Sequence, residues 1–208
     1  MRSKDYFDQI AGQWDTMRTA FFSEAVREKA YAAAGVRAGQ LAADIGAGSG
    51  FITEGLLQRG VSVIAVDQSE AMLAEMRRKF AGADLDLRLG EAESLPVADA
   101  SVDAVFANMY LHHVERPAQA IGEMRRLLKP GGRLAITDMD EHNFEFLRTE
   151  QYDRWLGFQR LDVSAWFMQA GLVSVTVEGV GESCCADSSC GSETATVSIF
   201  VACGVAPL

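Results

Sequence analysis

The chain has 208 residues, of which 49% are hydrophobic and 23% charged, a composition that can bury a core and that excludes disordered, collagen-like and disulfide-scaffold proteins. Its 19 Lys and Arg residues against 29 Asp and Glu residues give a net charge of −10, which disfavours nucleic acid or an anionic membrane as the main partner. The first five residues hold no apolar signal core, and no stretch reaches the apolar length of a membrane span. We expect a cytoplasmic protein of one domain, residues 1–208, and leave its oligomeric state open.

Residues 5–34 precede the first predicted strand and are predicted to form two helical stretches. Phe22, Val26, Ala30 and Ala33 follow one another at helical spacing, which indicates a helix with one apolar face. We expect residues 1–34 to form a helical cap.

From about residue 40, short apolar runs alternate with helical segments. Runs rich in Val, Ile and Ala predict five strands, at residues 41–45, 61–66, 85–89, 102–107 and 133–137. Helix signals lie between the strands: Gly60 stops one helix, Ser69 caps the next and Pro117 opens a third. This alternation predicts parallel βαβ units with helices on both faces of the sheet, within a core of residues 40–138.

The C-terminal part has a different pattern. An aromatic-rich segment at 143–170 is predicted to be helical, as an insertion spanning residues 139–171. Two β-branched runs at 172–177 and 194–203 have no helix between them, which predicts an antiparallel hairpin over residues 172–205. The fold expected is therefore α/β and Rossmann-like: a doubly wound, mostly parallel seven-stranded sheet, closed by a C-terminal antiparallel β-hairpin and covered by an N-terminal helical cap.

A glycine-rich turn follows the first predicted strand and contains Asp44, Gly46, Gly48, Gly50 and Phe51. Backbone N–H groups at such a strand-to-helix turn approach a ligand closely. A dinucleotide turn needs a small residue where Phe51 stands, and Asp44 would repel a pyrophosphate. The turn therefore favours a ligand with a positive amino group, such as an aminoacyl nucleoside.

Asp67 ends the second predicted strand. A carboxylate at this place accepts hydrogen bonds from both hydroxyls of a ribose, in dinucleotide enzymes as well, so Asp67 alone does not identify the ligand. We expect this carboxylate to be solvated when no ligand is bound.

Five motifs in order carry a resemblance to a known family. They are the turn at 44–50, Asp67, the run 90–96, the triplet 111–113 and the segment 126–132. Together they closely resemble class I S-adenosylmethionine-dependent methyltransferases, nearest to the UbiE-like, type 11 branch, over about residues 40–138.

The resemblance implies S-adenosylmethionine as cofactor and a set of residues that contact it. In the family the glycine turn follows the methionine moiety, the acid at the second strand holds the ribose, and the N-terminal cap folds over the cofactor. The resemblance also implies that the helical insertion at residues 139–171 lies on the acceptor side. The implied contacts are Tyr6, Arg18, Asp44, Gly46, Ala47, Gly48, Gly50, Asp67, Gln68, Met72, Glu91, Ala92 and Asn108. Met72 fits a core stripe equally well, and Arg18 either pairs with the methionine carboxylate or lies on the surface.

His112 and His113 follow the fourth predicted strand and are the candidate catalytic residues. Methyl transfer from a sulfonium is an in-line displacement in which alignment supplies most of the acceleration, and a base is needed only when the acceptor keeps its proton. His113 is expected to act as base or to orient the acceptor; alternatively, both histidines are structural. The sequence assigns no metal ligand.

Three cysteines, Cys184, Cys185 and Cys190, lie in a Gly- and Ser-rich segment between the last two predicted strands. Their spacing matches no paired zinc motif. Three thiols in one loop bind a soft ion or respond to redox conditions, or the segment is a plain connection. We expect it to lie away from the cofactor cleft.

The function expected is S-adenosylmethionine-dependent methyl transfer to a small-molecule acceptor. Three alternatives stay open. They are methylation of a metalloid or thiol acceptor captured by Cys184, Cys185 and Cys190, a non-catalytic S-adenosylmethionine-binding regulator, and a nicotinamide-dependent oxidoreductase, which Phe51 disfavours. No motif identifies the acceptor.

Overall fold

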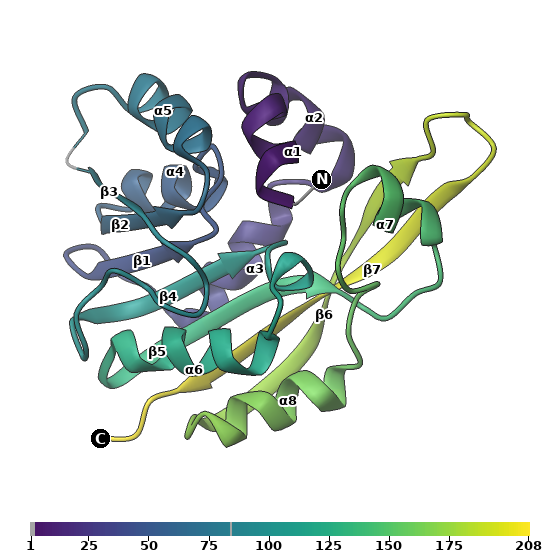
Figure 1. Cartoon of the computed structure of the whole chain (residues 1–208). Coiled ribbons are helices and arrows are strands. Elements are labelled where there is room, and N and C mark those ends of the chain that lie inside the picture. Colours follow the sequence, from purple (N-terminus) through teal and green to yellow (C-terminus); the bar gives the residue numbers. More distant parts are fainter. Residues whose placement is uncertain (1–2, 84) are drawn as a thin grey trace.

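The structure is a computed structural model that describes residues 3–83 and 85–208, so the first two residues of the N-terminal pentapeptide lie outside it. One seven-stranded sheet runs through the molecule in the order β3-β2-β1-β4-β5-β7-β6 (Figure 1). The strands are β1 (Leu41–Ile45), β2 (Ser62–Asp67), β3 (Leu85–Leu89), β4 (Val102–Asn108), β5 (Leu128–Met139), β6 (Val173–Asp187) and β7 (Thr194–Val205). The Rossmann-like, doubly wound fold is as predicted.

The first five strands are parallel, and β7 is antiparallel to both β5 and β6. From β1 the chain moves outward to β2 and β3, then returns to the other side of β1 as β4. Ligands in open α/β sheets bind at such a point of reversal, outside the carboxyl ends of the strands. The ends of β1 and β4 therefore define where a site is expected.

Helices cover both faces of the sheet, because the parallel strands alternate with amphipathic segments. On one face lie α3 (Ala25–Ala34), α4 (Phe51–Gln58) and α5 (Glu70–Lys79), packed on side chains such as Val63 and Phe106. On the other lie α6 (Pro117–Leu127) and α8 (Arg160–Gln169), packed on side chains such as Val105 and Ile136. Among the described residues, no helix has the length and apolar character needed to cross a membrane.

The N-terminal cap differs in detail from the two predicted helical stretches. It comprises α1 (Ser3–Ile10), a 3-10 turn at Ala11–Gln13 and α2 (Trp14–Phe21), followed by α3. Phe22, predicted to share a helix face with Val26, instead has extended backbone (φ −156°, ψ 155°). This break lets α1 and α2 turn away from α3 and lie over the ends of the central strands (Figure 1).

The C-terminal region also differs from prediction. The segment predicted as helical contains two helices, α7 (Glu145–Glu150) and α8, separated by a loop. The hairpin strands are longer than predicted, because β6 continues through Cys184 and Cys185, which pair with Val197 and Thr196 of β7. Only Cys190 lies in the connection between the two strands.

Candidate active site

The glycine turn after β1 forms the floor of a cleft. Gly46 and Gly48 have φ values of 65° and 53°, in the left-handed region that favours glycine. A Cβ atom on Gly46 would lie 2.1 Å from Cδ2 of Tyr110. Both the backbone conformation and the close approach of this ring therefore require glycine at position 46.

Asp67 ends β2 beside this turn. It accepts hydrogen bonds from the backbone N–H groups of Gly48 and Ser69, both at 2.8 Å, and is 9% exposed. Burial raises the pKa of this carboxyl, although these N–H donors oppose the shift. The expectation of a solvated carboxylate is wrong: Asp67 is buried, and its hydrogen bond with Gly48 holds the glycine turn in place.

Asp44, at 1% exposure, lies deeper in the cleft. Its Oδ2 accepts hydrogen bonds from the Thr53 backbone N–H at 3.0 Å and from the Thr53 hydroxyl at 2.7 Å. Burial raises the pKa of Asp44 to about 7, even though both bonds favour the ionised form. A cation beside Asp44 would therefore favour the ionised carboxylate and would be stabilised by its charge.

Arg18 of α2 closes one end of the cleft. Its guanidinium carbon lies 4.1 Å from the centre of the Phe51 ring, a cation–π contact, and one nitrogen lies 3.7 Å from Glu24. The Nε atom is buried and, among the described residues, has no hydrogen-bond partner. Since buried donors are normally satisfied, this nitrogen indicates a place for an anionic group.

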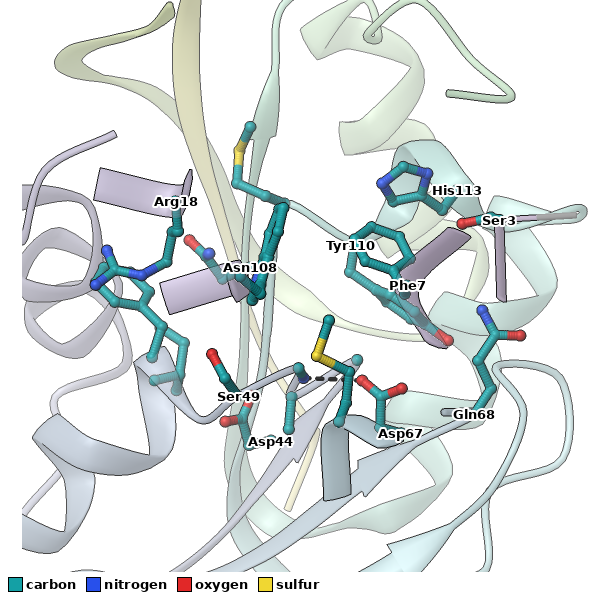
Figure 2. A pocket seen from close by; sticks show the side chains of 18 of the residues that line it. Ser3, Phe7, Arg18, Asp44, Ser49, Asp67, Gln68, Asn108, Tyr110 and His113 are labelled. Atoms are coloured by element: carbon teal, nitrogen blue, oxygen red, sulfur yellow. Dashed lines mark hydrogen bonds between the residues drawn. The ribbon is translucent and has the colours of Figure 1, made fainter. Parts of the chain in front are cut away.

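We call the space between these groups the central cleft. It holds about 680 Å³ of open space, including the solvent at its mouth. Figure 2 shows Arg18 at one side, Asp44 and Asp67 at the floor, Gln68 at the opposite side, and Phe7, Tyr110 and His113 above. The predicted residues that line it are Arg18, Asp44, Gly46, Ala47, Gly48, Asp67, Gln68, Met72, Asn108 and His113.

The other predicted residues lie elsewhere. Glu91 and Ala92 line a second hollow beside the cleft, together with Gln68 and Tyr110. Tyr110 lines both spaces, so its ring forms part of the wall between them. Two of the predicted cofactor contacts line neither space.

Tyr6 and Gly50 are these two residues. The Tyr6 hydroxyl donates a hydrogen bond to Gln151 Oε1 at 2.9 Å, which ties α1 to the loop after α7. A Cβ atom on Gly50 would lie 2.5 Å from Cε2 of Phe80, so this glycine permits close packing of α4 and α5.

A further hollow adjoins the central cleft, and we call it the chamber; it holds about 460 Å³ of open space, including the solvent at its mouth. The two share Phe7, Trp14, Phe22, Met109 and His113. Most of the chamber wall is apolar, and its polar groups are His112, His113, Gln151, Asp153 and Cys184. A space of this kind suits a small molecule with an apolar body and one polar end.

His112 is held by Asp138, the acid near the end of β5. Nδ1 of the ring lies 2.7 Å from Asp138 Oδ1, and the His112 backbone N–H donates to Oδ2 at 3.2 Å. Burial opposes a charge on the ring, but Asp138 and Asp153 outweigh it and raise the pKa of His112 to about 9. Burial, reinforced by the charge on His112, lowers the pKa of His113 well below its ordinary value.

The thiols of Cys184, Cys185 and Cys190 do not gather into one cluster. Cys184 lines the chamber, where burial, with a contribution from Asp153, raises its pKa to about 12. Cys185 and Cys190 are exposed, and among the described residues the three Sγ atoms do not all lie within 4.8 Å of one another. Among the described residues, none of the three cysteines lines the central cleft, and Cys184 lines the chamber beside it.

Sequence reasoning missed Tyr110, Asp138 and Asp153. Asp138 had a signal, because an acid near the carboxyl end of the strand beside β4 lies next to the residues that follow β4. Asp153 lies in an irregular loop and Tyr110 in a short connection, and neither has a sequence pattern that indicates its place.

Comparison with known proteins agrees with this geometry. Residues 43–136 match the model of the family described as a methyltransferase domain. A demethylmenaquinone methyltransferase from Renibacterium salmoninarum is 34% identical over 146 residues, 69% of this chain and 61% of that protein. A malonyl-[acyl-carrier protein] O-methyltransferase from Methylococcus capsulatus is 43% identical over 109 residues, 50% of this chain and 39% of that protein.

The chain thus spans less than two thirds of the length of these curated relatives. Among solved structures, a chain in the complex of the Haloferax volcanii Trm112 methyltransferase activator with a methyltransferase has a TM-score of 0.79 at 22% identity, covering 99% of this chain and 97% of that one. A phosphoethanolamine N-methyltransferase from Haemonchus contortus, bound to S-adenosylhomocysteine, has a TM-score of 0.70 at 17% identity, covering 86% and 51%. The sequence motifs, the fold and the matching domain agree, and the chain belongs to the class I S-adenosylmethionine-dependent methyltransferases, in the type 11 branch.

Proposed function

We propose that the chain binds S-adenosylmethionine in the central cleft and transfers its methyl group to a small molecule in the adjoining chamber. The order of polar groups along the cleft carries this proposal: Arg18 at one end, two buried carboxylates on the floor and Gln68 at the other end (Figure 2). An aminoacyl nucleoside presents its amino-acid charges, its ribose hydroxyls and its base in the same order.

Each polar group fits one part of this ligand. The unpartnered Nε of Arg18 suits the carboxylate, and Asp44 suits the ammonium group. Asp67 suits the ribose hydroxyls, and Gln68 leads to the second hollow with Glu91 and Ala92, which suits the adenine. A ligand that spans both spaces displaces the Tyr110 ring from its place over Gly46.

The bound cofactor supplies a methyl group that its sulfonium charge has already activated. The chain must then align the acceptor and exclude water. Phe7, Trp14 and Phe22 line both the cleft and the chamber, and their rings exclude water from the boundary between the two. His113 also lines both spaces, and in its neutral form it accepts or donates a hydrogen bond that orients the acceptor.

The alternatives have less support. Capture of a metalloid by three thiols has support from Cys184 only, because the other two thiols are exposed. A nicotinamide cofactor is disfavoured by Phe51, whose buried ring packs against Phe22 and Arg18 at the start of α4. The adjoining chamber offers an acceptor a place beside the cofactor, which favours methyl transfer over a purely regulatory role.

Calorimetry tests the proposed cofactor. We expect S-adenosylhomocysteine to bind with a micromolar or lower dissociation constant and NADH to show no comparable binding. Equal or tighter binding of NADH would overturn the proposal. A screen of small acceptors with isotope-labelled methyl donor then tests transfer, and apolar molecules with a single polar end are the first to try.

A further inference from the structure

Three titratable side chains meet at the polar end of the chamber. Nε2 of His112 and Nδ1 of His113 lie 3.7 Å and 3.9 Å from the same Oδ1 atom of Asp153. All three side chains are at least nine-tenths buried. Both distances exceed the length of a hydrogen bond, so these polar atoms face one another without satisfying one another.

The spacing suits a shared metal ion. Tetrahedral ions such as Zn²⁺ hold nitrogen and oxygen ligands at about 2.0–2.2 Å, which places the ligand atoms roughly 3.4 Å apart. Both contacts of Asp153 are only a few tenths of an ångström longer. Among the described residues, Nδ1 of His113 has one other polar contact, at 3.4 Å from the carbonyl oxygen of Tyr152, where a hydrogen bond is weak.

The surroundings hold the first of these ligands in place. Asp138 engages Nδ1 of His112 and also accepts a hydrogen bond from the Met139 backbone N–H at 2.8 Å. The ring is thereby oriented with Nε2 toward Asp153 and the chamber. In metal sites a ligating histidine commonly has its other ring nitrogen bound to a carboxylate in this way.

The backbone joins the two segments that carry the ligands. His112 and His113 lie in the 3-10 turn Leu111–His113 after β4, and Asp153 lies in the loop after α7. The carbonyl oxygen of His112 accepts hydrogen bonds from the backbone N–H groups of Arg154 and Trp155, both at 3.0 Å. These backbone bonds bring the three side chains together.

We propose that His112, His113 and Asp153 form a binding site for a divalent transition-metal ion whose remaining coordination position faces the chamber. Two imidazoles and one carboxylate suit Zn²⁺ or Fe²⁺ and do not suit Mg²⁺ or Ca²⁺, which prefer oxygen ligands. Three protein ligands with an open position are typical of metal sites that bind a substrate.

This site would select the acceptor, an inference that rests on the proposed function. An acceptor with an oxygen or sulfur donor at its polar end would coordinate the ion, while its apolar body occupies the rest of the chamber. Cys184, which lines the same chamber, supplies a neutral thiol beside the site.

Metal titration of chelator-treated protein tests the site. We expect one equivalent of Co²⁺ to produce the visible absorption bands of a low-symmetry site, and Zn²⁺ to displace it. Mg²⁺ should give no change. The variants His113→Ala and Asp153→Asn should weaken Co²⁺ binding at least tenfold, and Asp138→Asn should weaken it tenfold to a hundredfold.

The matched control is His142→Ala, which removes the remaining histidine of the chain, outside the cluster. It should bind Co²⁺ as the wild type does. Thermal unfolding of the same samples shows that each variant is folded, and binding of S-adenosylhomocysteine reports separately on the proposed function. Absence of stoichiometric Co²⁺ and Zn²⁺ binding by the wild type, or unchanged binding by both His113→Ala and Asp153→Asn, would overturn the site even where S-adenosylhomocysteine binds.

Discussion

Asp67 at the end of β2 accepts a 2.8 Å hydrogen bond from the backbone N–H of Gly48, so a carboxylate of one strand fixes the turn that follows its neighbour (Figure 2). A second bond, from the Ser69 backbone N–H, ties the same carboxylate to the start of α5. One side chain therefore shapes the floor of the cleft before any ligand arrives.

Asp67→Ala is expected to affect both stability and ligand binding. It leaves the buried N–H group of Ser69 and the partly buried N–H group of Gly48 without an acceptor, which costs about 1–3 kcal/mol each as an upper guide. We expect a lower free energy of unfolding in the free protein, together with at least tenfold weaker binding of S-adenosylhomocysteine. Chemical denaturation and calorimetry measure the two effects.

Two further variants separate the effect on stability from the effect on ligand binding. Asp67→Asn keeps an acceptor oxygen and should recover most of the stability but less of the affinity. Asp86→Ala, on the exposed part of β3, should change neither quantity. An unchanged free energy of unfolding for Asp67→Ala would show that the carboxylate does not stabilise the glycine turn.

Asp44 should make the stability of the free protein depend on pH. Its pKa in the folded protein, about 7, lies above the ordinary value of 3.8. The stabilisation this gives is therefore complete below about pH 4 and is lost as the pH rises through 7. Its upper bound is about 4 kcal/mol, for a shift of roughly three pH units. Denaturation at several pH values measures it.

Asp44→Asn should flatten this dependence, because the amide oxygen still accepts the Thr53 bonds. Binding of a cationic amino group requires the ionised carboxylate. We therefore expect the affinity of the wild type for S-adenosylhomocysteine to rise between pH 6 and 8 and that of the variant to change less. Parallel pH profiles of the two proteins would contradict this role.

Arg18→Met should weaken binding of S-adenosylhomocysteine about tenfold or more, because a charge-assisted hydrogen bond contributes about 1.5–3 kcal/mol. Methionine preserves much of the contact with Phe51. Arg27→Met is the matched control: Arg27 also stacks on Phe51, but it bonds to the Phe51 carbonyl and Glu54 and does not line the cleft. It should lower stability and leave affinity unchanged.

Replacing Cys184, Cys185 and Cys190 together with serine should leave cofactor affinity within about threefold, well below the tenfold change that 1.4 kcal/mol would produce. The single-residue variants should differ in their kinetics with any identified acceptor. Cys184→Ser should change the KM for the acceptor, and Cys190→Ser should not, because Cys190 lies at the exposed hairpin connection. Equal effects of the two would mean that the chamber is not the acceptor site.

The strands and the glycine turn could be predicted because they depend on local patterns. Leu41–Ile45 and Leu85–Leu89 have the predicted bounds, since each is a short apolar or alternating run flanked by turn residues. The turn around Gly46 was predicted because its glycines are required locally.

The chamber could not be predicted, because it depends on contacts between distant segments. Cys184 faces it only because β6 continues in register with Val197, and a Ser- and Gly-rich sequence gave no strand signal there. Asp153 reaches His112 through a loop whose path is set by backbone bonds to the His112 carbonyl. No periodic pattern in the sequence indicates the position of Cys184 or of Asp153.

Phe7, Trp14 and Phe22 line both the central cleft and the chamber, so the two spaces share one set of aromatic rings. A ligand that orders these rings from one side lowers the entropy cost of filling the other side. Thermodynamic linkage makes such coupling reciprocal: the factor by which the methyl donor tightens the acceptor equals the factor by which the acceptor tightens the donor. On the proposed function, the demethylated cofactor and the methylated acceptor should accordingly bind more tightly together than either binds alone.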